Sequence, residues 1–176
     1  MRLTVTLAAF LVIAISASAV FGQTTTREDF EDFCQIMQGR WLGEITLVTD
    51  MPGLGRAGEK PTAYVENRII ADGNAIDSVA YAGKGMAKWM TVWDAGSKQI
   101  RSLLVTSGGS TVQTVTSKKD GKWVEKRVGS KPDGSPLETK ATLTISPDGD
   151  THTWSGTTFD GVKTEDWQNV WKRVGK

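Results

Sequence analysis

The stretch GRWLGEITLV, residues 39–48, decides the fold of this 176-residue chain. Upstream of Gly39 the apolar residues recur at helical spacing. From Trp41 to Val48 they follow a period of two, which is typical of a half-buried β-strand. The change of period at Gly39-Arg40-Trp41 therefore predicts a short helix that ends at Gly39 and a first strand over Trp41–Val48.

The predicted helix covers Arg27–Gln38. Thr26 precedes it as an N-cap, and acidic residues fill its first turn, where the helix dipole favours them. Its apolar stripe consists of Phe30, Phe33, Cys34 and Met37. Gly39 supplies the backbone freedom that commonly ends a helix. We expect the stripe to pack against one end of the structure that follows.

Downstream of the first strand, the chain consists of short β-rich runs separated by turn residues. Asp-Gly pairs, which favour tight hairpin turns, recur at positions 72, 120, 133, 148 and 160. The predicted strands are Thr62–Ile70, Ala75–Ala82, Ala87–Asp94, Gln99–Thr106, Ser110–Ser117, Lys122–Val128, Glu138–Ile145, Thr151–Thr158 and Lys163–Val174.

Strands joined by such turns are antiparallel neighbours, and the connections leave no room for crossover helices. The sequence therefore predicts an all-β fold, an antiparallel up-and-down barrel of about 8–10 strands with one short N-terminal helix. Closure of the barrel removes exposed sheet edges. An open sandwich of two sheets is the alternative.

The N-terminus has the form of a secretory signal peptide. Arg2 is followed by the apolar stretch LAAFLVIAI, residues 7–15, and then by small residues. We expect cleavage after Gly22, or else after Ala19, which divides the chain into a signal peptide, 1–22, and one domain, 23–176. The alternative is a retained membrane anchor. The cleaved product would be exported, to the periplasm or the extracellular space, and would have no membrane span.

Removal of Arg2 leaves 20 basic and 20 acidic residues. A neutral chain offers no electrostatic surface for nucleic acid. The basic pair Lys118-Lys119 is expected to lie on a solvated turn. Cys34 is the only cysteine, so no internal disulfide forms. We expect its thiol to be buried as a small apolar group; a reactive thiol is the alternative.

The Gly-x-Trp motif, Gly39-Arg40-Trp41, resembles the signature of the lipocalins and the wider calycin superfamily. The layout of residues 28–174 also resembles lipocalin-like families of exported bacterial proteins that have no assigned function. The resemblance implies that Trp41 lies at the closed end of the barrel and that an arginine of the last strand, Arg173, packs over its ring. It implies no specific ligand, because a cysteine pair and a second lipocalin motif are missing.

Catalytic residues are not recognised. His152 is the only histidine and follows a turn, so we expect a partly exposed strand residue. No nucleophile motif surrounds a serine or the cysteine, and one histidine with one cysteine makes a zinc site a poor interpretation. No cofactor is expected; haem held by His152 is an alternative, because some related small barrels bind haem through one histidine.

Two groups of strand residues are candidates for a ligand pocket. Trp89 and Trp93 share one face of their strand, which is either packed core or an aromatic pocket wall. Tyr64, Glu66 and Arg68 share a face of theirs. If that face points inward, it forms a polar floor; if it is solvent-exposed, the opposite and more apolar face is core.

The segment Thr49–Pro61 carries two large apolar residues, Met51 and Leu54, among glycines. Such a segment either covers a barrel mouth as a lid or packs on the barrel.

The sequence thus favours a barrel that binds a small hydrophobic or amphipathic molecule. A structural or protein-interaction module with a filled core is the first alternative. A haem-dependent or carboxylate-based enzyme is the second. The oligomeric state is not indicated.

Overall fold

The computed structural model describes residues 25–175. It contains one α-helix, one short 3-10 turn and ten strands that form a closed antiparallel barrel. The predicted all-β barrel with one N-terminal helix is therefore confirmed, and the open sandwich is wrong. The predicted signal peptide, 1–22, lies outside the described residues.

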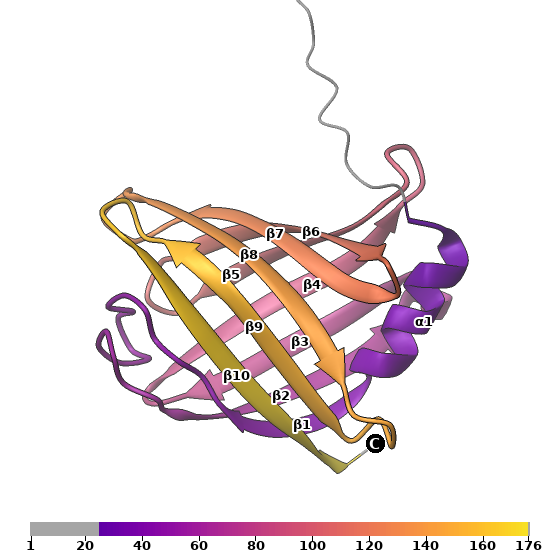
Figure 1. The fold of residues 1–176 in the computed structure, drawn as a ribbon, viewed down its shortest axis with the longest axis horizontal. Helices are drawn as coiled ribbons and strands as arrows, with labels where there is room; N and C mark the ends of the chain where they lie inside the picture. The colour runs from indigo at the N-terminus through magenta and orange to yellow at the C-terminus, as the bar shows by residue number, and fades with distance from the viewer. Residues whose placement is uncertain (1–24, 176) are drawn as a thin grey trace, which may run out of the picture.

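The strands follow one another around the barrel in chain order, and β1 closes it by pairing with both β2 and β10 (Figure 1). The elements are α1 Arg27–Met37, β1 Gly39–Glu44, β2 Thr62–Ile70, η1 Ala71–Gly73, β3 Ala75–Ala82, β4 Gly85–Asp94, β5 Gln99–Thr106, β6 Thr111–Lys119, β7 Lys122–Ser130, β8 Pro136–Ile145, β9 Thr151–Phe159 and β10 Thr164–Gly175.

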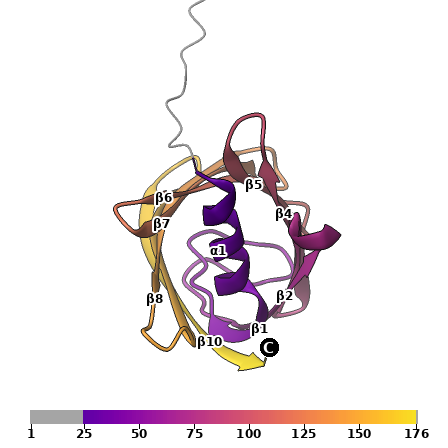
Figure 2. The ribbon, with the colours of Figure 1, turned by 90° about the vertical axis from the view of Figure 1, so that its right-hand side faces the viewer.

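Helix α1 lies across one end of the barrel (Figures 1 and 2). Thr26 and Asp29 form a capping box at its start, each side chain bonding to the other's backbone N–H. Phe30, Phe33 and Cys34 are buried against the barrel interior, and the Phe33 ring meets Trp123 edge-on at 5.1 Å. The apolar stripe therefore plugs this end, as the sequence predicts, and we call it the helix end.

Cys34 is buried within this plug, which confirms the sequence prediction. Burial raises the pKa of its thiol to about 11, so the thiol stays protonated at neutral pH. Lys118 departs from the prediction of a solvated turn face. Its ammonium group lies 3.4 Å from Asp29 and 3.3 Å from Asp32, so it ties β6 to the helix.

Strand β1 is shorter than predicted: it ends at Glu44 instead of Val48. The backbone N–H of Thr46 donates to the Oδ1 atom of Asn169, at 2.7 Å, instead of to a strand carbonyl. The chain leaves the sheet at this point and forms the segment 45–61 at the end of the barrel opposite the helix (Figure 1). We call this the loop end.

The Asp-Gly turns use their aspartates in two ways. Asp120 and Gly121 both adopt positive φ, 50° and 74°, which is the backbone of a tight two-residue hairpin. Asp133, Asp148 and Asp160 instead accept hydrogen bonds from backbone N–H groups two residues ahead. These bonds, together with serine hydroxyls at Asp133 and Asp148, hold the pKa of the three carboxyl groups below the usual value.

The first and last strands of the barrel, β1 and β10, meet at Trp41. Its indole N–H donates to the carbonyl of Met37, at 3.0 Å, and its side chain is 2% exposed. The guanidinium carbon of Arg173 lies 4.1 Å from the centre of the ring. The placement of Arg173 over Trp41 that the lipocalin resemblance implies is therefore present.

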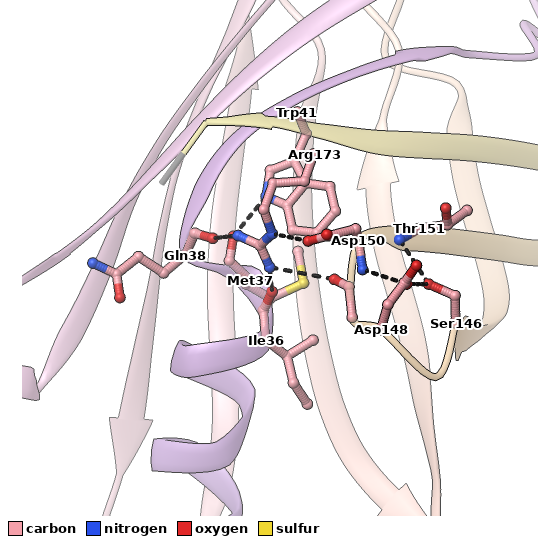
Figure 3. A network of polar contacts seen from close by, with 10 residues as sticks. Ile36, Met37, Gln38, Trp41, Ser146, Asp148, Asp150, Thr151 and Arg173 are labelled. Carbon is pink, nitrogen blue, oxygen red and sulfur yellow. Dashed lines mark hydrogen bonds and ion pairs between the residues drawn. The ribbon is translucent and has the colours of Figure 1, made fainter.

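Arg173 also ends the helix (Figure 3). Its guanidinium donates to the carbonyl groups of Ile36 and Gln38, at 3.4 and 2.5 Å, where the last turn of α1 leaves its acceptors unpaired. Its Nε atom donates to Asp150 at 3.0 Å, in the turn between β8 and β9. One side chain thus joins the helix, the first strand, the last strand and a hairpin turn.

We expect Arg173→Met to lower the free energy of unfolding by about 2–4 kcal/mol, because it removes a cation–π contact and charge-assisted hydrogen bonds. Urea unfolding followed by far-UV circular dichroism measures the change. Lys172→Met is the matched control, since Lys172 is exposed on the adjacent, outward-facing position of β10. If the two variants unfold at the same urea concentration, Arg173 does not stabilise the closure of the barrel.

Candidate functional site

The candidate site is the cavity inside the barrel, between the helix end and the loop end. Its volume is about 330 Å³, within the usual range for small-molecule pockets. Every strand contributes inward-facing residues to its wall. Side chains alternate between the two faces of each strand, so every second residue of a strand points into the cavity.

Five tryptophans contribute to the apolar surface of the cavity: Trp41, Trp89, Trp154, Trp167 and Trp171. Two of them pack over glycines in the barrel wall. A Cβ atom on Gly43 would lie 2.9 Å from the ring of Trp171, and one on Gly156 would lie 3.0 Å from Trp167. A Cβ atom at either position would also lie 2.3 Å from a backbone carbonyl oxygen, of Val170 or of Lys140, so both positions require glycine and both rings pack closely over them.

A polar surface covers the neighbouring strands β6 to β9. Thr114, Thr116, Thr139 and Thr158 point inward and are buried. The hydroxyls of Thr139 and Thr158 are 2.8 Å apart, and the indole N–H of Trp167 donates to Thr158 at 2.9 Å. These groups satisfy one another, so this part of the wall is polar without being strained by unpaired donors.

Two charged residues on β7, Glu125 and Arg127, project into the same space. The Nε atom of Arg127 donates to the Oε2 atom of Glu125 at 2.7 Å, and its Nη2 atom lies 2.5 Å from the same oxygen. Thr116 donates to the other carboxylate oxygen at 3.3 Å. The pair is therefore electrically neutral and held in place inside the barrel.

The segment 45–61 closes the loop end, where Leu47 and Leu54 are buried against Ala63 and Ala82. The N–H of Lys84 donates to the carbonyl of Gly53 at 2.9 Å. This close approach depends on glycine: a Cβ on Gly85 would lie 2.9 Å from the Gly53 carbonyl carbon.

The same segment reaches the β5–β6 turn on the other side. A Cβ on Gly108 would lie 2.3 Å from the Pro52 carbonyl oxygen. The segment 45–61 thus packs against the β3–β4 turn on one side and the β5–β6 turn on the other. It also lines the cavity at the loop end.

The predicted site residues separate into three groups. Trp89, Met51 and Leu54 line the cavity. Trp93 shares the inward face of β4 but packs into the apolar core under the helix.

The third group, Tyr64, Glu66 and Arg68, lies on the outer face of β2. Arg68 donates to Glu66 at 2.9 and 2.7 Å, and its side chain is 70% exposed. The inward face carries Ala63, Val65 and Asn67 instead. Tyr64, Glu66 and Arg68 would form a polar floor only if they pointed inward, and in the structure they do not.

Sequence reasoning missed Glu125 and Arg127. A signal was present, because both share parity with Trp123, a large apolar residue that a strand of a barrel would turn inward. Their opposite charges at a spacing of two also allow them to neutralise each other on one face. The inward threonines carried no comparable signal, since threonine is common on both faces of a strand.

His152 was expected to be partly exposed, and this prediction is wrong. Its ring is 2% exposed and stacks on Trp41, with centroids 3.8 Å apart and an angle of 28°. Since His152 and Arg173 each lie about 4 Å from the centre of the same indole, they occupy its opposite faces. The first lies on β9 and the second on β10, so the indole lies between side chains from two paired strands.

Burial, together with the nearby charge of Arg173, lowers the pKa of His152 to about 4. The imidazole is therefore neutral at physiological pH. Its Nε2 atom is enclosed and has no hydrogen-bond partner among residues 25–175. Haem iron would need that atom to face open space, so the position of the ring does not fit haem.

Within residues 25–175, no group of three or more histidine, cysteine, aspartate or glutamate side chains is placed to hold a metal ion. The same part of the chain contains no helix long and apolar enough to cross a membrane. The wall of the cavity carries aromatic rings, hydroxyl groups, the side-chain amides of Asn67 and Asn169, and one ion pair.

The depressed pKa of His152 predicts a loss of stability in acid. The folded state keeps this group neutral below pH 6.5, whereas the unfolded chain takes up a proton, so the contribution is full above pH 6.5 and is lost as the pH falls towards 4. We expect a loss of about 3 kcal/mol over that range. His152→Phe keeps an aromatic ring against Trp41 and should remove this part of the pH dependence.

The measurement is urea unfolding at several pH values between 4 and 7.5, compared between the wild type and His152→Phe. Carboxyl groups titrate in the same range, and the difference between the two proteins removes their contribution. Parallel stability curves would contradict the assignment of a buried, neutral His152.

A scan of the chain against protein-family models and a search among curated proteins find no match. The closed antiparallel barrel of ten strands is consistent with a calycin-type barrel.

Proposed function

We propose that this protein binds a small amphipathic molecule inside its barrel. The observation that carries the proposal is the cavity of about 330 Å³, whose wall combines tryptophan rings with hydroxyl groups. A wall of this kind is complementary to a molecule with an apolar body and a polar end. Helix α1 covers one end of the barrel and the segment 45–61 packs across the other.

The filled-core alternative gains less support. The packed apolar cluster under the helix includes Ile76, Ile100, Trp123 and Leu143, and it extends to Trp154 and Trp167 in the wall of the cavity. The cavity of about 330 Å³ remains beside it. Small side chains line the part of the wall formed by β3 and β4, among them Ala80 and Ala87. Alanine at these inward positions leaves space that a structural core would fill with larger residues.

A neutral fluorescent probe, N-phenyl-1-naphthylamine, tests the proposal. We expect its emission to rise and shift to the blue on addition of the protein, because it moves from water into an aromatic cavity. Ala80→Phe places a ring in the cavity and should weaken binding at least tenfold. Val79→Phe adds the same ring one residue away, on the outer face of β3, and is the control.

Circular dichroism and thermal unfolding would establish that both variants keep the fold. Absence of probe binding to the wild-type protein would overturn the proposed function. Equal loss in the two variants would place the probe outside the barrel. Mass analysis of an organic extract from the purified protein would then identify any natural ligand.

We further propose that the protein is exported, which the signal-peptide pattern of residues 1–22 supports. When the full chain is produced in a bacterium, its intact mass should correspond to a mature protein that begins at Gln23. An unprocessed chain that begins at Met1 and stays with the membrane fraction would contradict export and support a retained anchor.

A further inference from the structure

The inference concerns the polar end of the ligand and rests on the proposed function. Glu125 and Arg127 are the two charged residues among those that line the cavity in the described part of the chain. His152 also lines it but is neutral. Both lie on the inward face of β7. Any charge selection by the cavity therefore depends on this pair.

Arg127 is fixed in position by its surroundings. Its guanidinium carbon lies 5.6 Å from the ring centre of Trp154 and 5.7 Å from that of Trp167, which is within the range of cation–π attraction. Glu125 holds the Nε edge of the guanidinium and is itself held by Thr116. The guanidinium therefore has little freedom to turn towards a ligand or away from one.

Arg127 has more donors than its protein partners use. A guanidinium carries five N–H groups, and Glu125 accepts from the Nε and Nη2 atoms alone. The side chain of Arg127 is 31% exposed although it points into the barrel, whereas that of Glu125 is 9% exposed. The remaining N–H groups, on Nη1 and Nη2, are thus available to an acceptor in the cavity.

The carboxylate of Glu125 sets the charge that this acceptor must have. It already neutralises Arg127, so an anionic ligand would leave a net negative charge in a cavity of low polarity. An unpaired buried charge is strongly unfavourable. An uncharged carbonyl oxygen accepts the same N–H groups without that penalty.

The wall opposite β7 fits the rest of such a molecule. In the closed ring of ten strands, β2 lies across the barrel from β7, with β3 beside it. Their inward residues include Val65 and Ala80, which leave room for an apolar chain, whereas the polar Asn67 and Ser78 of the same faces lie nearer the helix end.

We propose that Arg127 binds the carbonyl oxygen of an uncharged amphipathic ligand, and that Glu125 excludes ligands that carry a carboxylate. Arg127 is the binding residue. Glu125 is a specificity-determining residue that acts through the charge it places beside the site. The cavity thereby distinguishes ketones, esters or amides from the corresponding acids.

Competition against N-phenyl-1-naphthylamine at pH 7.5 tests this assignment with three molecules of equal chain length: 2-octanone, octanoate and 1-octene. In Glu125→Gln, which is close in shape and removes the negative charge, octanoate should bind at least tenfold more tightly than to the wild type. The affinity for 2-octanone should change less than threefold.

The double variant Glu125→Gln/Arg127→Gln removes both charges together and avoids leaving a buried carboxylate unpaired. It should bind 2-octanone at least fivefold more weakly than the wild type, whereas the affinity for 1-octene should change less than twofold. Thermal unfolding establishes that each variant is folded. Glu125→Gln tests the role of Glu125, and the double variant tests the role of Arg127.

An unchanged affinity of Glu125→Gln for octanoate would overturn the role of Glu125. Equal losses for 2-octanone and 1-octene in the double variant would overturn the role of Arg127. In both cases the naphthylamine probe still binds the wild type, so the proposed function would stand. Failure of the probe itself to bind would overturn both.

Discussion

The structure depends on one indole ring that is held on both faces. Trp41 lies between the guanidinium of Arg173 and the imidazole of His152, and its N–H bonds to the helix that precedes it. A barrel of hairpins has only one pairing that no turn enforces, the one between its first and last strands. The contacts of Trp41 stabilise that pairing, β1 with β10, and at the same time fix the helix across the adjacent opening.

The fold was largely predictable from the sequence. Asp-Gly pairs indicate the hairpin turns. A change in the spacing of apolar residues between Met37 and Trp41 indicates where the helix ends and the first strand begins. The exact end of β1 was not predictable, because it depends on a long-range hydrogen bond from Thr46 to Asn169. Local propensity contains no information about such a partner.

The site was less predictable, for a physical reason. The parity of a strand shows which residues share a face, but burial decides which face is inside. On β2 a polar set and an apolar set compete, and the apolar set faces inward together with one polar residue, Asn67. His152 was misjudged because its position near a turn suggested exposure, whereas the ring it stacks on comes from a strand more than a hundred residues away.

The pairing of β1 with β10 has a consequence for the order in which the protein matures. Trp41 is synthesised long before its partner on the opposite edge, Arg173, which follows it by more than a hundred residues. The hairpins between them can form locally, while the pairing of β1 with β10 waits until β10 has been synthesised, and contacts of such long range slow folding. For a chain that is exported as proposed, this delay keeps the nascent polypeptide open and able to cross a membrane until β10 is available.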